Sequence, residues 1–539
     1  MRPITEIADW MGIDPSNVYP FGRYKAKLSL DAIQHESPNG KMILVTAVTP
    51  TKAGEGKTTT TVGLTQALGK LGYRAAATLR EPSLGPIFGI KGGGTGGGAS
   101  LVEPQDEVNI HFTGDAHAVS SAHNLLAALT ENVAQRGKIN GFRPENITWR
   151  RVSDMEDRSL RSIISGLGGT NNAPLRETGF DIVTASEIMA ILALSSDLED
   201  LRARIKKVIV GTMEDQTPVT VEDVDAVGSI MALLRHAIQP NLVQTTEGQP
   251  VVIHTGPFGN IAHGCSSVVG DRLARGYVDY VLTEAGCGAD LGFEKYIDIK
   301  ARANGLEPSA VVMVTTVRAM KSHGGVKFRD LDSTNIAAVE KGCANLEHLI
   351  GVIRSYGLPV VAAINEFPSD TSEEIDIVKK RAEAAGAQAA VRSRVFAEGG
   401  DGGIELAEAI VEAAKDEPAL TYLFPEDAPV EDKVKILATN IYGADDVAWA
   451  PSAKRMLRRF HKNGWGTLPV CMAKTHLSIS HNPRLQGKPS GYTFEISEIR
   501  ASVGAGFIYP IAGTMMTMPG LPGSPRALDV DSQGNIIGL

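Results

Sequence analysis

Long hydrophobic runs are absent from this 539-residue sequence. No stretch approaches the ~18 consecutive apolar residues that a membrane-spanning helix needs. The first four residues, Met1 to Ile4, also lack the basic-then-apolar layout of a signal peptide. We therefore expect no association with a membrane, and we expect a cytoplasmic location.

Runs of basic residues are absent as well. The formal net charge is −9 and is spread along the chain. A protein that holds nucleic acid instead gathers lysines and arginines against the phosphates. We therefore expect no nucleic-acid partner.

Cysteine is scarce, with four residues that lie far apart and form no CxxC pair: Cys265, Cys287, Cys343 and Cys471. This spacing signals neither a zinc site nor a redox motif. Free thiols are the expectation.

The remaining composition is that of an ordinary globular protein, with 43% hydrophobic and 21% charged residues. Short β-rich runs alternate with helix-period segments, which indicates an α/β fold with a mainly parallel sheet and helices on both faces. The predicted strands are residues 42–48, 75–79, 208–210, 251–254, 278–282, 311–315 and 360–364. A single helix is predicted over 186–204, with Ser186 as its N-cap.

The strongest local signal follows the first of these strands. A loop and then an apolar helix come next, which is the order of a phosphate-binding P-loop. The loop residues are Thr51, Lys52, Ala53, Gly54, Glu55, Gly56, Lys57 and Thr58. Lys57 suits the outer phosphates of a nucleotide and the Thr58 hydroxyl suits magnesium. Thr51 stands where the usual pattern has its first glycine, so an ordinary glycine-rich turn remains an alternative. Lys52 matches the extra lysine of partition-type ATPases or is a solvated loop residue.

A second candidate loop follows the next strand, with Arg80 and Glu81 at its start and Lys91 before a run of glycines. Parallel strands present their carboxyl ends to one crevice, so this loop is expected to face the P-loop. The planar guanidinium of Arg80 suits a carboxylate or an acyl phosphate. A surface ion pair between Arg80 and Glu81, followed by a flexible linker, is the other interpretation.

Seven separated motifs resemble the formate-tetrahydrofolate ligase family over nearly the whole chain. They are TPTKAGEGKTTTT, LREPSLGPIFGIKGG, NIHFTGDAHAVSSAHNLLAA, HTGPFGNIAHGCSS, TEAGCGADLGFEK, PVCMAKTHLSIS and MTMPGLP. The resemblance implies a P-loop NTPase-like fold with smaller α/β domains. It also implies a homotetramer that a monovalent cation, K⁺ or NH₄⁺, activates.

The reaction that the resemblance implies joins formate to tetrahydrofolate at the expense of ATP, through formyl phosphate. Two anions must be held together, which fixed cations and amides achieve. By resemblance Lys57 and Thr58 serve ATP and Mg²⁺, and Arg80 holds formate or formyl phosphate. Glu81, Lys91 and Asp115 are further candidates for substrate or magnesium contacts, and Asp115 is equally suited to a structural role.

Aromatic side chains are expected to hold the folate pterin ring. Phe367, in the sequence NEFP, and Phe396, in VFAEGG, match the aromatic pair of the family. The second position often carries tryptophan in relatives, so this chain departs from that pattern. For each phenylalanine, core packing is the alternative.

Other polar residues give weaker signals. His111, His117 and His123 are spaced for hydrogen-bonded structural roles better than for a metal cluster. Glu284, Asp290 and Glu294 are expected in a solvated acidic loop, with a cation or nucleotide role as the alternative. The segment from Pro519 to Pro522 is expected, on the resemblance alone, to wall the nucleotide pocket.

Three domains are predicted because the length exceeds the ~100–200 residues of one compact core. They are a P-loop nucleotide-binding domain over 1–345, an α/β domain with folate-site loops over 346–430, and a C-terminal domain over 431–539. The chain has no room for the appended dehydrogenase and cyclohydrolase of multifunctional relatives, so a monofunctional enzyme is expected. The rival functions are a partition-type ATPase switch and a ligase that activates a larger carboxylic acid.

Overall fold

The computed structural model describes residues 1–34, 40–89, 94–169 and 171–538. Lys91 lies outside these residues. Within them, no helix is long and apolar enough to cross a membrane.

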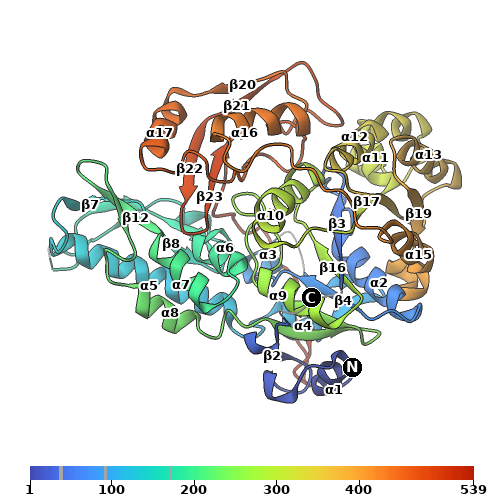
Figure 1. The fold of residues 1–539 in the computed structure, drawn as a ribbon, viewed down its shortest axis with the longest axis horizontal. Coiled ribbons are helices and arrows are strands. Elements are labelled where there is room, and N and C mark those ends of the chain that lie inside the picture. Colours follow the sequence, from blue (N-terminus) through green and yellow to red (C-terminus); the bar gives the residue numbers. More distant parts are fainter. Residues whose placement is uncertain (35–39, 90–93, 170, 539) are drawn as a thin grey trace.

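The centre of the molecule is a mixed, mostly parallel sheet, as the sequence predicts (Figure 1). Seven neighbouring strands run parallel, in the order β15 (Pro250–Ile253), β4 (Ala75–Leu79), β16 (Tyr280–Glu284), β3 (Lys41–Ala47), β17 (Ala310–Thr315), β18 (Val360–Asn365) and β19 (Ala389–Ser393). The other strands are antiparallel and lie beyond β15: β14 (Asn241–Thr245), β2 (Ala26–Leu28), β1 (Val18–Pro20), β6 (Ser100–Glu103) and β5 (Gly96–Gly97).

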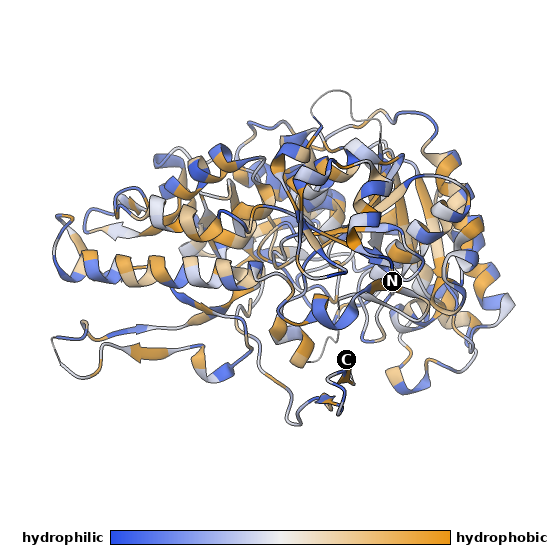
Figure 2. Ribbon diagram, turned by 90° about the horizontal axis from the view of Figure 1, so that it is seen from below, coloured by the Kyte–Doolittle hydropathy of each residue, from blue (hydrophilic) through white to orange (hydrophobic). Residues whose placement is uncertain are grey.

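Helices cover both faces of this sheet. Along β3, Ile43 and Val45 pack into a core that also holds α2 (Lys57–Lys70) and α15 (Ile404–Ala413). Leu44 points the other way, into a core that holds α12 (Ile336–Ser355). Successive strand side chains alternate between faces, so one apolar strand supplies two cores. Figure 2 shows the hydrophobic strands enclosed between these layers.

Six of the seven predicted strands lie in this sheet, with ends shifted by up to two residues. The run 208–210 does not. It belongs to β12 (Ile209–Met213), which pairs antiparallel with β7 (Phe142–Ile147) and β13 (Pro218–Thr220) in a separate sheet. A short apolar run does not reveal which sheet it joins, because that depends on distant pairing.

The single helix predicted over 186–204 is wrong, because the structure has two helices there. Ser186 caps α6 (Glu187–Leu194) as predicted, and its side chain accepts a hydrogen bond from the Ile188 amide. The chain then turns extended at Ser195, and Asp197 caps α7 (Leu198–Lys206). A strong N-cap residue competes with helix continuation, so the apolar period alone was misleading.

Two further units flank the sheet. On one side lies a lobe with α5 (Asp115–Gln135), α8 (Val227–Leu234), α7, β7 and β12 (Figure 1). The C-terminal unit, orange to red, contains α16 (Val430–Ile436), α17 (Pro451–Lys462), β20 (Asp446–Trp449), β21 (Thr493–Ile496), β22 (Glu498–Ser502) and β23 (Phe507–Ile511). Helix α6 packs against α5 and α9 (Val268–Tyr277), and α9 covers β4 and β16.

The remaining elements are short or lie on the outside. They are α1 (Ile4–Met11), α3 (Leu84–Phe88), α4 (Gln105–Asn109), α10 (Arg302–Asn304), α11 (Val317–His323), α13 (Ser372–Ala384), α14 (Val395–Glu398), β8 (Arg151–Ser153), β9 (Ile163–Ser165), β10 (Arg176–Thr178), β11 (Phe180–Ile182), β24 (Asp529–Val530) and β25 (Ile536–Ile537), with π-helical turns at Ala289–Phe293, Tyr296–Ala301 and Leu437–Ile441. Strands β18 and β19 come from the predicted second domain but lie in the same sheet as β3. The division into three domains stays a prediction.

Candidate active site

The segment between β3 and α2 has the strand, loop and helix order predicted for a P-loop. Gly54 and Gly56 have φ values of 75° and 79°, in the left-handed region that favours glycine. Gly56 is the N-cap of α2, and a Cβ there would lie 2.7 Å from the Asn365 amide nitrogen. The first amides of α2 have no intrahelical acceptor and therefore face the loop as donors for an anion.

Two side chains hold the loop in shape. The buried Glu55 carboxylate accepts a hydrogen bond from the Thr51 amide at 2.6 Å. Asn365, the last residue of β18, donates to the Glu55 carbonyl at 2.7 Å and accepts from the Thr60 hydroxyl at 3.1 Å. Burial raises the pKa of Glu55, and the Lys57 charge opposes that rise. The loop is thus fixed by its own acid and by a strand two positions away in the sheet.

Thr58 and Glu284 meet at the base of the loop. The Thr58 hydroxyl lies 3.0 Å from one carboxylate oxygen of Glu284 and 3.3 Å from the other. Glu284 ends β16, the neighbour of β3, so adjacent parallel strands bring the two together. A hydroxyl and a carboxylate are ligands that suit Mg²⁺, which is bound by one or two carboxylates and otherwise by phosphates and water.

The Lys57 ammonium makes no hydrogen bond or ion pair with any residue that the structure describes. It is half-buried at the start of α2. Lys52 is exposed, and the outer side of the loop borders a cavity of about 440 Å³ that Lys327, Phe328 and Gln486 also line. The loop therefore carries one lysine without a charged partner among the described residues, Lys57, and a second, Lys52, beside open space for a ligand.

Arg80 directly follows β4, two strands away from β3. One terminal nitrogen donates to the Pro257 carbonyl at 3.3 Å, and the buried Nε has no partner among the described residues. A Cβ on Gly286 would lie 3.2 Å from the other terminal nitrogen, so glycine makes room for the guanidinium. Two non-glycine residues of the adjoining loops, Thr255 and Cys287, have φ values of 56° and 60°. Such unfavourable backbone conformations gather where a binding site imposes its geometry.

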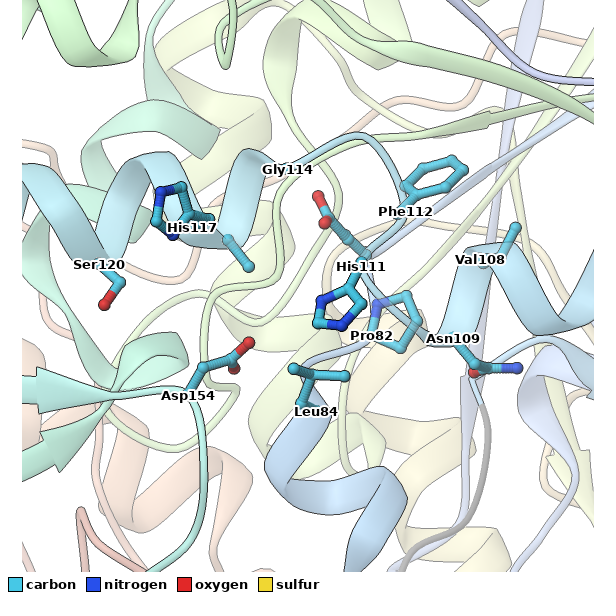
Figure 3. A pocket seen from close by; sticks show the side chains of 12 residues that line it. Pro82, Leu84, Val108, Asn109, His111, Phe112, Gly114, His117, Ser120 and Asp154 are labelled. Carbon is cyan, nitrogen blue, oxygen red and sulfur yellow. The ribbon is translucent and has the colours of Figure 1, made fainter. Parts of the chain in front are cut away.

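Glu81 lines a different cavity, of about 360 Å³ (Figure 3). Burial, together with the negative charges of Asp115 and Asp154, raises the pKa of Glu81 well above its usual range. One of its carboxylate oxygens is buried without a partner among the described residues. His111 and Asp154 extend toward one another in the same cavity. Glu81 does not form the surface ion pair with Arg80 that was one interpretation of the sequence.

Asp115 is engaged inside the protein. Its buried carboxylate pairs with Lys27 at 2.7 Å and accepts from the Asn241 amide at 2.8 Å. It begins α5, where a negative charge also faces the positive end of the helix dipole. These contacts fit the structural alternative, and a substrate contact of Asp115 stays a prediction.

The three histidines of this region differ in setting. His123 is buried, lies 2.8 Å from the Ser186 hydroxyl and stacks on Trp149, so its predicted hydrogen-bonded structural role is confirmed. Burial lowers the pKa of His123 to about 3. His111 and His117 are exposed and line the cavity of Figure 3. Within the residues described, no group of three His, Cys, Asp or Glu side chains is arranged to hold a metal ion.

Phe367 and Phe396 follow the adjacent strands β18 and β19 at their carboxyl ends. The Arg318 guanidinium lies 4.9 Å from the centre of the Phe367 ring. Phe396 is 64% exposed, which excludes a core-packing role for that ring. Its backbone carbonyl accepts from the Ala99 amide, and this bond ties α14 to the glycine-rich segment after β4.

The expectation of a solvated acidic loop at Glu284, Asp290 and Glu294 is wrong, because all three residues are buried. Asp290 pairs with Lys474 at 2.5 Å. A π-helical turn folds this segment into the core beneath the sheet. Composition alone predicted a solvent-exposed loop because Lys474, the cation that pairs with Asp290, lies 184 residues further along the chain.

The segment from Pro519 to Pro522 lies against Arg158, whose guanidinium donates to the Leu521 carbonyl at 2.5 Å. Arg161 donates to the Met518 carbonyl at 2.8 Å. These contacts give no support to a role in the nucleotide pocket.

Sequence reasoning gave no role to Asn365 and Lys474. Asn365 stood two positions before the noted Phe367. Glu284 was noted, but a cation or nucleotide role was only the alternative to a solvated loop. Lys474 lay in the motif PVCMAKTHLSIS but received no role. The signal available for Asn365 and Glu284 was their place at the carboxyl end of a parallel strand.

The comparisons with known proteins agree over the full length of the chain. The family model described as formate–tetrahydrofolate ligase matches residues 1–539. Proteins named formate–tetrahydrofolate ligase from Desulforamulus reducens, Roseiflexus sp. and Symbiobacterium thermophilum are each 50% identical to the chain. The alignments cover 100% of this chain and 97%, 98% and 98% of those relatives.

The α/β fold and these matches define an enzyme of the ligase class. More specifically, the chain belongs to the formate–tetrahydrofolate ligase family.

Proposed function

We propose that this chain joins formate to tetrahydrofolate with ATP, giving 10-formyltetrahydrofolate, ADP and phosphate, and that Lys57 and Arg80 are its catalytic residues. Membership of the family supports the reaction. The observation that carries the residue assignment is the shared edge of the sheet. The P-loop, Glu284 and Arg80 all lie at the carboxyl ends of β3, β16 and β4, which are neighbours.

ATP is assigned to the loop from Thr51 to Thr58, whose backbone we propose to be of the P-loop NTPase type. The opening amides of α2 and the Lys57 ammonium would hold the β- and γ-phosphates. The Thr58 hydroxyl and the Glu284 carboxylate fit Mg²⁺, which supplies charge neutralisation on the phosphates. Lys57 would stabilise the negative charge that develops on the phosphoryl group during transfer.

Formate is assigned to Arg80. A formate oxygen attacks the γ-phosphorus, the bond to the ADP oxygen breaks, and formyl phosphate and ADP result. The unpaired side of the Arg80 guanidinium suits a small carboxylate and then the acyl phosphate that replaces it. Glycines at 259 and 286 border the guanidinium. Because the backbone at these glycines lies close to the guanidinium, the arrangement supports a one-carbon acid in preference to a larger one.

Tetrahydrofolate is assigned to a slot between Phe367 and Phe396. Flat rings gain stacking and burial against aromatic faces at low entropy cost. The folate amine attacks the formyl carbon, the carbon–oxygen bond to phosphate breaks, and inorganic phosphate leaves with the proton balance completed by solvent. The exposed Phe396 ring, on a strand end next to that of Phe367, supports this assignment.

Further properties belong to the same proposal. The family implies a cytoplasmic homotetramer with activation by K⁺ or NH₄⁺. Glu81, Lys91 and Asp115 remain candidates for substrate or magnesium contacts, and the chain is proposed to divide into domains at 345 and 430. The raised pKa and unpartnered oxygen of Glu81 support a contact with a substrate or cation.

The decisive experiment is an assay of formyl transfer with the purified chain, ATP, Mg²⁺, formate and tetrahydrofolate, followed by absorbance of the formylated folate. Product should require all three substrates. Acetate should not replace formate, which separates this function from a ligase for larger acids. ATP hydrolysis that is independent of formate and folate would instead favour a partition-type ATPase.

A further inference from the structure

A cavity of about 540 Å³ lies between the α5 lobe and the C-terminal unit. None of the residues proposed for catalysis lines it. Its walls come from α6, β12, α17, β22 and β23, and they include two of the four tryptophans of the chain. The aromatic lining residues are Trp149, Phe460, Trp465, Phe507 and Tyr509. Since only 5% of the chain is aromatic, this wall is unusually suited to a flat ring.

Three arginines and three acids also line the cavity. Four of them neutralise one another in two ion pairs, at 3.1 and 2.6 Å: Arg150 with Asp181, and Arg500 with Glu498. Arg459 and Glu187 remain, each without a partner of opposite charge among the described residues.

Arg459 projects from α17. Its two terminal nitrogens donate to the side-chain and main-chain oxygens of Gln216, at 2.7 and 2.8 Å. Both acceptors are neutral, so the positive charge is oriented but not compensated. A carboxylate or a phosphate is the group that such a guanidinium binds best.

Glu187 opens the first turn of α6. Its Oε1 accepts hydrogen bonds from the Gly504 and Ala505 amides at 2.8 and 3.3 Å. The described residues offer no donor to Oε2. Burial raises the pKa of Glu187 to about 7. Because no described residue donates to Oε2, the ionised carboxylate can accept there from a ligand that carries N–H groups.

The floor of the cavity is connected to the proposed formate site. Ile261 and Ala262 line the floor and belong to the loop over 256–264. In the same loop the Phe258 amide donates to the Thr184 carbonyl at 2.7 Å, next to α6, and the Pro257 carbonyl accepts from Arg80. One short loop thus touches both the cavity and the guanidinium.

We propose that this cavity is a second small-molecule site, which binds a planar N-heterocycle through N–H groups on Glu187 and a carboxylate or phosphate on Arg459. Its occupation alters the formate dependence of the ligase through the 256–264 loop, a consequence that rests on the proposed function. A 2-amino-4-oxopyrimidine ring supplies adjacent N–H donors, and it occurs with a carboxylate in folates and with a phosphate in guanine nucleotides.

The test measures binding of folic acid and of guanosine monophosphate to the full chain by calorimetry. Arg459→Gln should weaken binding about tenfold or more, because a charge-assisted hydrogen bond is lost. Arg458→Gln is the matched control, since Arg458 is exposed on the same helix and does not line the cavity. Because Arg459 also holds Gln216, Ala501→Phe, which fills the cavity from β22, serves as a second variant. It should weaken binding as well.

Phe396→Ala separates this site from the proposed pterin slot. Binding that survives Phe396→Ala and is lost in Arg459→Gln and Ala501→Phe supports the second site. Binding by only one probe identifies its source as folate or nucleotide. If neither probe binds, or if Phe396→Ala abolishes binding while the two cavity variants keep it, the second site is refuted. If a probe binds in the cavity without changing the KM for formate, the regulatory part is refuted, whatever the outcome of the formyl-transfer assay.

Discussion

Replacement of Phe396 distinguishes a ring that binds substrate from one that supports the fold. The side chain is 64% exposed, so Phe396→Ala removes little buried surface. Truncation of a fully buried phenylalanine costs ~3–5 kcal/mol of stability, and the cost here should be far smaller. Stacking of a ring on an aromatic side chain contributes on the order of 1–3 kcal/mol by alanine substitution. Since about 1.4 kcal/mol corresponds to a tenfold change, the KM for tetrahydrofolate should rise roughly tenfold or more.

The assay is steady-state kinetics with each substrate varied in turn, alongside thermal unfolding. Phe396→Ala should raise the folate KM, leave the ATP KM unchanged and shift the melting temperature little. Phe396→Trp should keep or improve folate binding because it enlarges the stacking face. Phe21→Ala is the matched control, since Phe21 is 41% exposed and far along the chain from the site. An unchanged folate KM in Phe396→Ala, with normal stability, would refute the assignment of the pterin ring to Phe396.

Four further predictions concern the phosphate edge and one buried histidine. Lys57→Ala should remove most activity without unfolding the chain, and Lys57→Arg should rescue poorly because a guanidinium has different reach; normal turnover at saturating ATP contradicts the P-loop assignment. Arg80→Gln should abolish synthesis while calorimetry still detects ATP binding, and loss of ATP binding with a normal formate dependence would oppose the assignment. Glu284→Gln should raise the Mg²⁺ concentration needed for half-maximal rate, and a wild-type magnesium titration would exclude Glu284 from the metal site. The folded pKa of His123 is lowered to about 3, so the unfolded chain binds a proton there first as the pH falls below about 6.5. The free energy of unfolding should therefore drop between about pH 6.5 and 3, by up to ~1.4 kcal/mol per pH unit for one proton. His123→Phe should make the free energy of unfolding, measured with denaturant at each pH, depend less on pH.

The parallel sheet was predictable because its strands are continuous apolar runs, and such runs announce burial on both faces. The ends of β3, β4 and β18 were placed within one residue for that reason. The break between α6 and α7 was not, because Asp197 interrupts an apolar period that otherwise continues. The antiparallel pairing of β12 with β7 joins residues that are 60 or more positions apart, which local pattern does not encode.

At the candidate site, the glycines and Lys57 predicted the loop, and in the structure they lie at the N-terminus of α2. The Thr58–Glu284 contact required knowing that β16 lies beside β3, although the two strands are more than 200 residues apart in sequence. The burial of Asp290 required its distant partner Lys474. Sequence pattern thus located loops, whereas the sheet order decided which loops meet.

Asn365 gives the two proposed substrate sites a common reference point. Its amide clamps the Glu55 carbonyl, and two residues later the same strand end carries Phe367. Two residues span at most roughly 7 Å, so the backbone limits how far the ring of Phe367 can lie from the phosphate loop. In the proposed assignment, this stretch of backbone couples the position of the pterin ring to that of the ATP phosphates. One inserted residue between 365 and 367 would misalign them while leaving each binding surface chemically intact, a kind of failure that affinity measurements on single substrates would not detect.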